Sequence, residues 1–346
     1  LDGGLGNNTL SYASSTSGVT MSLLAGAGTG GDATGDTYSN FSNLIGSGQA
    51  DTLIGDAGGN SIQGGAGDDN IDGDAGNDSL YGGTGNDTFL GGSGNDYMQG
   101  DGGTDTVDYS ASSSGVNANL NNGTGSGGDA QGDTYNTIEN LTGSTNGDTL
   151  TGNGSANVLI GGDGNDNLSG LGGNDTITGG NGNDAITGGA GADALDGGAG
   201  TNTLFFGTNF GNYASVSVST GVTINLDGVT LGIGGDAAGD TYANFQRVYL
   251  TNRDDSVTGT GIDEWFRGLG GADTIDGGGG TDTVDYQGSA SISIGLDGAA
   301  GSGGEAAGDR LYNIEILSGS NFDDTLWGNS SANQLFGNDG ADTFRG

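Results

Sequence analysis

A single apolar residue recurs every nine positions between residues 64 and 108, and the residues on either side of it are mostly polar. Side chains alternate between the two faces of a β-strand, so this pattern predicts three-residue strands with one side chain facing inward. A strand this short buries too little surface to be stable alone, and it gains stability by stacking on copies of itself. The pattern therefore predicts a solenoid, which we interpret as two nine-residue units per coil. The apolar residues of this run are Ile71, Leu80, Phe89, Met98 and Val107.

Glycine and aspartate occupy fixed places in the same nine-residue unit. The run reads GGAGDDNID, GDAGNDSLY, GGTGNDTFL, GGSGNDYMQ and GDGGTDTVD, with aspartate at the sixth position of every unit. The glycines permit the positive φ angles that a tight turn requires. Stacked turns would align the aspartates in rows, close to the carbonyl groups of the turns. Sites made of carboxylate and carbonyl oxygens suit a hard cation with flexible coordination, which indicates calcium rather than magnesium.

The unit Gly-Gly-x-Gly-x-Asp-x-apolar-x resembles the calcium-binding nonapeptide of the RTX (repeats-in-toxin, haemolysin-type) family, and the resemblance covers roughly two thirds of the chain. It implies an all-β fold, a parallel β-roll or β-solenoid with several Ca²⁺ ions in its turns. It also implies a secreted bacterial protein, exported by type I secretion, whose repeats stay unfolded in the low-calcium cytosol and fold outside the cell.

Aspartate stands at the sixth position of sixteen recognisable units, and these residues are our candidate metal ligands. They are Asp51, Asp69, Asp78, Asp87, Asp96, Asp105, Asp148, Asp166, Asp175, Asp184, Asp193, Asp255, Asp273, Asp282, Asp324 and Asp342. Other residues replace aspartate there mostly near the edges of blocks of units, where we expect weakened or absent sites. These residues are Asn8, Asn60, Asn157, Asn202, Asn333 and Glu264.

A second acidic motif recurs outside the nonapeptides as GGDATGD, GGDAQGD, GGDAAGD and GGEAAGD. Two acids four residues apart in a glycine-rich loop could form a further calcium site, but a solvated acidic loop explains them almost as well. The acids concerned are Asp32, Asp36, Asp129, Asp133, Asp236, Asp240, Glu305 and Asp309.

The nonapeptides fall into four blocks that are separated by related connectors. Each connector begins near a tyrosine and contains an alternating stretch such as VTMSL, from Val19, or VNANL, from Val116. Strict alternation predicts strands, so we expect the connectors to continue the solenoid as wider coils. The blocks span residues 46–108, 143–205, 250–285 and 319–345, and the connectors begin at Tyr12, Tyr109, Tyr213 and Tyr286.

Four cassettes, each a connector followed by its block, are therefore predicted to form one continuous solenoid. Their bounds are residues 1–108, 109–205, 206–285 and, as a partial cassette, 286–346. The chain begins and stops in the middle of a unit, so we expect it to be a segment of a longer polypeptide or to abut other copies of itself.

The composition restricts both folding and function. The 346 residues include 44 acidic and five basic ones, giving a formal net charge of −39, together with 82 glycines. Glycine entropy and carboxylate repulsion oppose compaction, so folding and metal binding are expected to be coupled. Histidine and cysteine are absent, which excludes Ser-His-Asp and Cys-His nucleophiles, the usual zinc sites and disulfides. The charge argues against a nucleic-acid partner, and no apolar run is long enough to insert into a membrane.

Three functions remain open at this stage, and we favour the first. The array itself is the function in a structural or assembly protein outside the cell, such as a surface layer, an adhesin or an extracellular filament. Its partners would be calcium and other copies of itself or a cell-surface component, and it would not be an enzyme. The alternative is an accessory RTX tail of a larger secreted enzyme whose catalytic domain lies outside this chain. Ice binding is the third, but threonine ladders are not continuous here.

Overall fold

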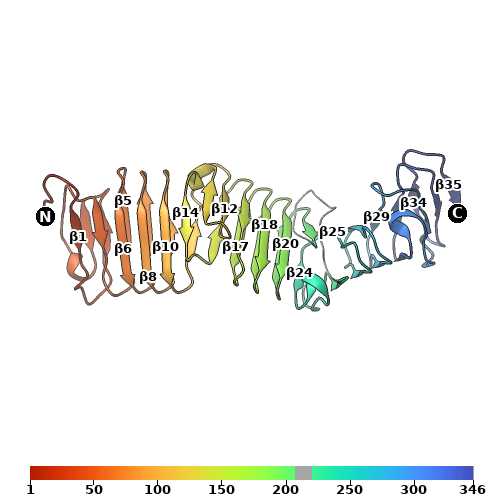
Figure 1. Ribbon diagram of the computed structural model, residues 1–346, viewed down its shortest axis with the longest axis horizontal. Coiled ribbons are helices and arrows are strands. Elements are labelled where there is room, and N and C mark those ends of the chain that lie inside the picture. The colour runs from red at the N-terminus through yellow and green to blue at the C-terminus, as the bar shows by residue number, and fades with distance from the viewer. Residues whose placement is uncertain (207–219, 346) are drawn as a thin grey trace. The chain divides into compact units, whose positions relative to one another are not determined.

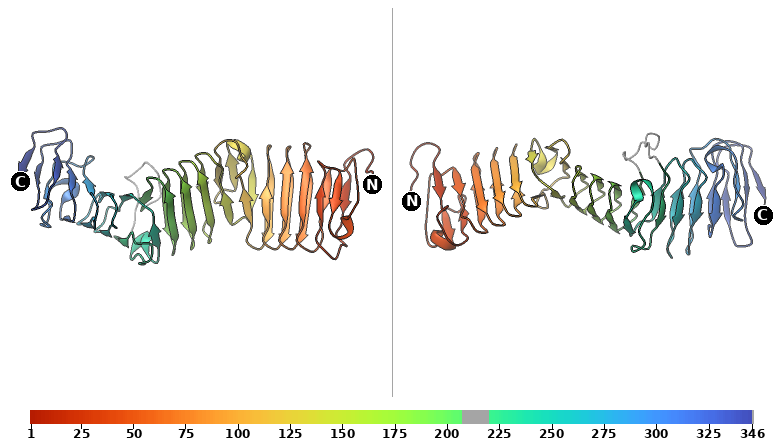
Figure 2. Two further views of the ribbon diagram at one scale, coloured as in Figure 1. Left: turned by 180° about the vertical axis from the view of Figure 1, so that it is seen from behind. Right: turned by 60° about the horizontal axis from the view of Figure 1, so that its bottom comes forward.

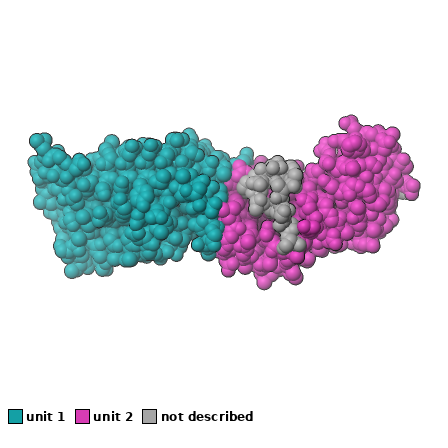
Figure 3. Space-filling model, in the orientation of Figure 1, with its two compact units in different colours: residues 1–166 teal, residues 167–346 magenta. Residues whose placement is uncertain are grey.

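The structure is a computed structural model that describes residues 1–206 and 220–345. Its contacts divide the chain into two compact units, residues 1–166 and 167–346, which Figure 3 shows in different colours. The described residues contain no α-helix, and no helix among them is long and apolar enough to cross a membrane. Tyr213, where the third connector was predicted to begin, lies outside the described residues.

Unit 1 is built from strands that alternate between two parallel sheets. Figure 1 shows β6, β8 and β10 as neighbouring rungs, and both views of Figure 2 show the same stacking of these orange strands. The first sheet contains β1 (Thr9–Ser11), β4 (Asn43–Ile45), β6 (Ser61–Ala66), β8 (Ser79–Thr84), β10 (Tyr97–Gly102) and β14 (Thr134–Asn136). The second contains β2 (Thr20–Ser22), β5 (Thr52–Asp56), β7 (Asn70–Asp74), β9 (Thr88–Leu90), β11 (Thr106–Asp108), β15 (Asn140–Thr142) and β17 (Val158–Asp163).

The register of these sheets sets the length of a coil. Ile62 of β6 pairs with Leu80 of β8, and Leu53 of β5 pairs with Ile71 of β7. Each pair is 18 residues apart, the separation that also recurs in the hydrogen bonds between successive turns. Two nonapeptides therefore make one coil, and the predicted all-β parallel β-roll is confirmed.

The connectors continue the sheets as wider coils, as the alternation predicted. Met98 pairs in parallel with Tyr135 across the second connector, so the connector strand β14 takes the place of a nonapeptide strand. The extra residues leave the roll as an antiparallel hairpin, β2 with β3 (Ala27–Thr29) in the first connector and β12 (Asn117–Asn119) with β13 (Thr124–Ser126) in the second. β12 then pairs in parallel with β16 (Thr149–Thr151). Each acidic GG-(D/E)-A motif forms a short 3₁₀ turn, namely η1 (Gly31–Ala33), η2 (Gly128–Ala130), η3 (Gly235–Ala237) and η4 (Gly304–Ala306).

Unit 2 repeats the same architecture. One parallel sheet contains β18 (Asn167–Gly172), β20 (Ala185–Ala190), β22 (Thr203–Phe205), β25 (Arg247–Tyr249), β27 (Trp265–Arg267), β29 (Thr283–Asp285), β32 (Ile316–Ser318) and β34 (Gln334–Phe336). The opposite side carries three shorter ladders. The first ladder contains β19 (Thr176–Asn181), β21 (Ala194–Ala199) and β24 (Thr241–Ala243). The second contains β23 (Thr223–Asn225), β26 (Ser256–Thr258), β28 (Thr274–Asp276) and β31 (Arg310–Tyr312). The third contains β30 (Ser293–Gly295), β33 (Thr325–Trp327) and β35 (Thr343–Arg345). The four-cassette division and the continuity of the solenoid along the whole chain stay predictions.

The core consists of the eighth-position side chains, with larger residues added by the connectors. Ile71, Leu80, Phe89, Met98 and Val107 are all fully buried, as the nine-residue period predicted. The seventh and ninth residues of the same strands lie on the outer surface of the sheet and are half-buried, except for Asn70, which is exposed. Each coil thus contributes one inward side chain per strand, so stability depends on every coil having a neighbour.

Replacement of Phe89 by alanine is expected to destabilise the calcium-loaded protein by about 3–5 kcal/mol, because it leaves a cavity between β7 and β11. Chemical denaturation at saturating calcium measures this change. Leu90→Ala is the matched control, since Leu90 lies on the outer face of the same strand and is only half-buried. An equal loss in both variants would contradict the inward and outward assignment.

Candidate metal sites in the turns

Two conformations occur among the turns of the nonapeptides. In one, which we call open, the residues at the second and fourth positions have positive φ, as with Gly65 at 119° and Gly67 at 107°. In the other, which we call closed, neither residue lies in the left-handed region, as with Ser47 and Gln49. The sixth residues of the open turns are Asn8, Asp69, Asp78, Asp87, Asp96, Asp105, Asp166, Asp175, Asp184, Asp193, Asn202, Asp273, Asp282 and Asp342. Those of the closed turns are Asp51, Asn60, Asp148, Asn157, Asp255, Glu264, Asp324 and Asn333.

In an open turn, one carboxylate oxygen is fixed by the preceding coil. The Asp51 backbone N–H donates to Asp69 Oδ1 at 2.8 Å, and the Asp69 N–H donates to Asp87 Oδ1 at 2.8 Å. The same bond links Asn60 to Asp78 at 2.7 Å on the other side of the coil. These bonds align the carboxylates in the rows that the sequence predicted.

In many of the open turns, the second carboxylate oxygen is buried and accepts no hydrogen bond. A buried acceptor without a donor is costly, and the cost is greater when the group is charged. This arrangement repeats in both units, so it is a property of the turn rather than a local defect. It holds for Oδ2 of Asp69, Asp78, Asp87, Asp96, Asp105, Asp193, Asp273 and Asp282.

The space that this oxygen faces is also lined by a carbonyl group of the next coil. A methyl group built on Gly73, the first residue of its turn, would lie 2.5 Å from Asp78 Oδ2 and 2.6 Å from the Gly91 carbonyl oxygen. Glycine leaves this space free, and both groups that face it are acceptors. A hard cation with oxygen ligands fits such a place. No three acidic side chains among the described residues are grouped to hold a metal, so carbonyl oxygens would supply part of its coordination.

Burial makes the charged form of these carboxylates unfavourable. It raises the pKa of Asp69 and of Asp78 to about 7, and that of Asp87 to about 6, against a partial opposing effect of the backbone hydrogen bonds. Burial, with Asp309 as the next largest cause, raises the pKa of Asp273 to about 9. The folded turns therefore favour either a proton or a cation at these oxygens.

In a closed turn, the protein itself satisfies both carboxylate oxygens. The Ser47 N–H donates to Asp51 Oδ2, the Ser47 hydroxyl donates to Oδ1 at 2.9 Å, and the N–H of Val19 in the connector donates to Oδ1 at 2.7 Å. Ser144 and Val116 hold Asp148 in the same way. The arrangement recurs with Thr251 and Val222 around Asp255, and with Ser320 and Ile292 around Asp324.

The other closed turns use an uncharged amide or a longer acid. Asn60 Oδ1 accepts the Asp56 N–H at 2.8 Å, while its Nδ2 donates to the Ser42 carbonyl at 2.9 Å. Asn157 makes the equivalent pair of bonds with Asn153 and Glu139. Glu264 Oε1 accepts the Thr260 N–H at 3.0 Å, but its Oε2 is buried and has no donor. Asn60 and Asn157 thus close their turns by hydrogen bonds within the protein, and the expected weakening of metal sites at block edges stays a prediction.

The acidic turns of the connectors are also tied to the protein. Asp133 Oδ2 accepts the Tyr109 hydroxyl at 2.7 Å, and its Oδ1 accepts the Asp96 N–H at 2.9 Å. Asp133 therefore continues the aspartate row, but a tyrosine takes its second oxygen. Equivalent tyrosine bonds join Tyr12 to Asp36, Tyr242 to Asp240 and Tyr286 to Asp309.

The first acid of each connector turn is less buried. Burial is the main cause that raises the pKa of Asp96, and the charge of the nearby Asp129 raises it further. Burial and the charge of Asp236 raise the pKa of Asp193 in the same way. Glu305 instead lies 3.7 Å from the Arg267 guanidinium. Asp32 is exposed.

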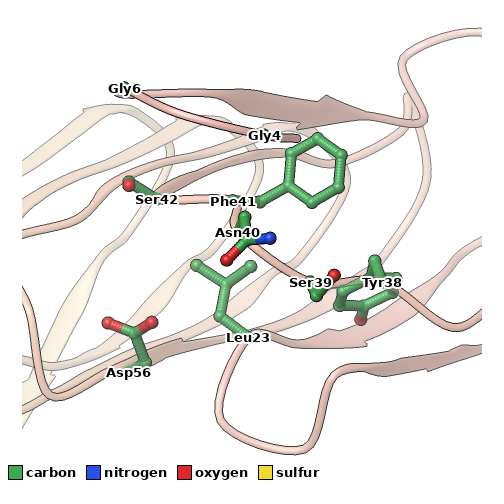
Figure 4. Close-up of a pocket in the computed structure, with 9 residues that line it drawn as sticks. All are labelled: Gly4, Gly6, Leu23, Tyr38, Ser39, Asn40, Phe41, Ser42 and Asp56. Atoms are coloured by element: carbon green, nitrogen blue, oxygen red, sulfur yellow. The ribbon is translucent and has the colours of Figure 1, made fainter. Parts of the chain in front are cut away.

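A pocket between the first connector and the start of the first block contains none of the predicted ligands (Figure 4). It is lined by Leu23, Tyr38, Asn40 and Phe41, and Asp56 supplies its one carboxylate. Asp56 Oδ1 accepts the Gly58 N–H at 2.9 Å, a bond within its own turn. The pocket therefore lacks the paired carboxylates that hydrolytic chemistry would need.

Comparison with known families identifies the repeats. The family described as RTX calcium-binding nonapeptide repeat (4 copies) matches residues 45–80, 81–111, 142–177, 169–204, 258–288 and 313–346, more than half of the chain. The chain belongs to the RTX family. It is a calcium-binding repeat protein, and RTX repeats of this kind are typical of secreted proteins. No curated protein matches this RTX chain.

The open and closed conformations of the RTX turns were not predicted from the sequence. The sequence does contain a signal for them at the fourth position, which is glycine in every open turn but another residue in seven of the eight closed turns. Positive φ strains residues that carry a Cβ, so a non-glycine fourth residue favours the closed form. Gly58 is the exception.

Asp69→Asn is expected to lower the calcium stoichiometry of the folded protein by at least one, because it replaces the unpartnered Oδ2 with an amide. Isothermal titration calorimetry measures the stoichiometry. Asp68→Asn is the control, since it removes the same charge from an exposed side chain in the same turn. An unchanged stoichiometry in Asp69→Asn, or an equal loss in Asp68→Asn, would contradict the assignment.

Acid is expected to stabilise the calcium-free protein. Because burial raises the pKa of Asp69 and Asp78 from 3.8 to about 7, the folded state binds protons more tightly than the unfolded state. The contribution to stability is therefore present near pH 4 and is lost as the pH rises to about 7. Circular dichroism and thermal melting at pH 5 and pH 8 in calcium-free buffer test this, and Asp69→Asn/Asp78→Asn should show a shallower dependence. Greater β-structure at pH 8 than at pH 5 would contradict it.

Proposed function

We propose that this RTX protein acts outside the cell as a structural or assembly component whose array folds when calcium binds. The observation that carries the proposal is the repeated buried aspartate oxygen without a donor in the open turns. A chain with a net charge of −39 needs counterions to stack these turns, and calcium supplies charge and coordination together. Folding would therefore follow the calcium concentration.

The proposed ligands are the aspartates of the open turns together with carbonyl oxygens of the stacked coils. Asp51, Asp148, Asp255 and Asp324 are left out, because serine or threonine already bonds to both of their carboxylate oxygens. The connector acids Asp36, Asp133, Asp240 and Asp309 bond to tyrosine and are left out for the same reason. Asp129 and Asp236 remain proposed auxiliary acids beside Asp96 and Asp193.

Export explains why a protein would depend on calcium in this way. A chain that stays largely unfolded at low calcium can be secreted as a polypeptide and then fold in a calcium-rich medium. Type I secretion and a cell-surface location are part of this proposal, and they rest on the family resemblance. Calcium-binding repeats are the family that matches more than half of the chain, so we propose that the array itself is the function.

Surface features of unit 2 support association with other copies or with a cell-surface component. Phe205 and Tyr249 stack with ring centroids 4.8 Å apart, Tyr249 and Trp265 lie 5.0 Å apart, and the Arg247 guanidinium lies 5.3 Å from the Trp265 ring. This cluster places aromatic and cationic groups on the outer face of β22, β25 and β27. On an acidic protein, such a patch is complementary to acidic surfaces elsewhere on the same chain.

A calcium titration followed by circular dichroism and sedimentation velocity tests the proposal, with magnesium as the control. We expect a cooperative gain of β-structure with calcium and not with magnesium, and concentration-dependent association of the calcium-loaded protein. β-Structure that is unchanged by chelator would contradict calcium-dependent folding. A calcium-loaded protein that stays monomeric at high concentration would contradict the assembly role alone.

A further inference from the structure

Buried aspartate oxygens without a donor are confined to particular parts of the described chain. None occurs in residues 12–63 or 109–160, each of which consists of a connector followed by the first coil of the next block. In residues 64–108, by contrast, all five sixth-position aspartates have such an oxygen. Buried oxygens that a cation could coordinate are therefore concentrated in residues 64–108 and absent from residues 12–63 and 109–160.

The first coils of the first and second blocks are closed by the protein on both sides. In the first block, Ser47 closes the turn around Asp51, and the amide of Asn60 closes the opposite turn by bonding to the Ser42 carbonyl. In the second block, Ser144 and Asn157 do the same. A hydroxyl and a backbone N–H thus supply the positive ends that a cation would supply in an open turn.

The connector that precedes each first coil is closed as well. Tyr12 donates to Asp36, and Tyr109 donates to Asp133 and is 2.7 Å from the Tyr135 hydroxyl. These tyrosines are almost completely buried, so the connector has a larger apolar core than a nonapeptide coil. A tyrosine hydroxyl thus supplies the donor for the second carboxylate oxygen of Asp36 and of Asp133.

Connector and first coil are joined directly. The Val19 N–H donates to Asp51 Oδ1 at 2.7 Å, and Met21 of β2 pairs in parallel with Leu53 of β5. On the other sheet, Leu10 pairs with Leu44 and Leu44 pairs with Ile62. The segment therefore has paired strands on both sheets and a continuous core.

The number of acidic side chains differs between these segments in the same way as the number of buried oxygens without a donor. Residues 12–63 contain four acidic side chains, whereas the shorter stretch 64–108 contains ten. Residues 109–160 also contain four, and residues 161–205 contain six. Repulsion between carboxylates is therefore weakest where the turns are closed.

We propose that the connector and first coil of the first, second and fourth blocks form a calcium-independent seed segment, on whose edge strands the calcium-dependent coils stack. The seed segments that lie entirely within the described residues are 12–63, 109–160 and 286–336. In the last of these, Ser320 closes the turn around Asp324, and Tyr286 donates to Asp309. Ser47, Ser144 and Ser320 donate hydrogen bonds to both oxygens of the aspartate in their turns, so these turns do not require calcium. This inference rests on the proposed calcium-dependent folding of the other turns.

Hydrogen exchange of the full chain, measured by mass spectrometry with and without calcium, tests the proposal. In calcium-free buffer, peptides from residues 12–63 and 109–160 are expected to exchange at least tenfold more slowly than peptides from 64–108. With calcium, all of these regions should be protected. Equal, fast exchange of the seed segments and residues 64–108 in calcium-free buffer, with protection everywhere on adding calcium, would overturn this inference alone. Absence of any calcium effect would instead overturn the proposed function.

Two variants test the hydrogen bonds that carry the argument. Tyr12→Phe/Ser47→Ala removes two donors while keeping most of the packing, and it should abolish the calcium-free protection of residues 12–63 without changing that of 109–160. Ser93→Ala is the control, since Ser93 is exposed in an open turn. Unchanged protection in the double variant would contradict the role of these bonds.

The calcium stoichiometry provides an independent readout. Asp51→Asn is expected to leave the stoichiometry unchanged, whereas the same substitution at Asp69 lowers it, because Asp51 already has donors on both oxygens. A loss of one calcium in Asp51→Asn would show that the closed turn does bind the ion and would overturn the proposal.

Discussion

The structure depends on one constraint, which is that a carboxylate buried in a stacked turn needs a positive partner for each of its oxygens. The coil before it supplies one partner, the backbone N–H that bonds to Oδ1 in every row. The second oxygen has three solutions in this chain. The Ser47 backbone N–H satisfies Oδ2 of Asp51, a tyrosine hydroxyl satisfies Oδ2 of Asp133, and Oδ2 of Asp69 has no donor within the protein. Only the third solution leaves a buried oxygen for which a cation would be a favourable partner, and we propose that stacking at these turns depends on calcium.

Backbone conformation selects among these solutions. Where the second and fourth residues have positive φ, as at Gly65 and Gly67, no backbone N–H of the turn bonds to Asp69 Oδ2. At Ser47 and Gln49 neither residue is left-handed, and the Ser47 N–H bonds to the aspartate. The same sixth-position aspartate is thus a proposed metal ligand or an internal hydrogen-bond acceptor, depending on the φ angles of the residues two and four positions before it. Aspartate alone does not define a calcium site.

The sequence predicted the fold well, because the information is local and repeated. One apolar residue in nine identified the core from Ile71 to Val107, and the alternation at Val19 identified a connector strand that pairs within the roll. The candidate sites were predicted less completely, since all sixteen aspartates share one position. What separates Asp51 from Asp69 is the fourth residue of the turn, Gln49 against Gly67, and its effect acts through φ rather than through chemistry at the site. The tyrosine partner of Asp133 lies 24 residues away, beyond any local pattern.

An array made only of open turns would face a difficulty in starting to fold. The first coil would have to order glycine-rich turns, bring carboxylates together and bind calcium before any neighbour could share the cost. Closed turns remove that requirement at the start of a block, because Ser47 and Asn60 complete their coil without an ion. The next coil then adds β7 and β8 to the existing edges of β5 and β6, and its carboxylates receive backbone donors that are already in place. In this proposal, the coils that bind calcium add to a sheet that has already formed. Because closed turns recur along the chain, fewer residues have to become ordered in each step that depends on calcium.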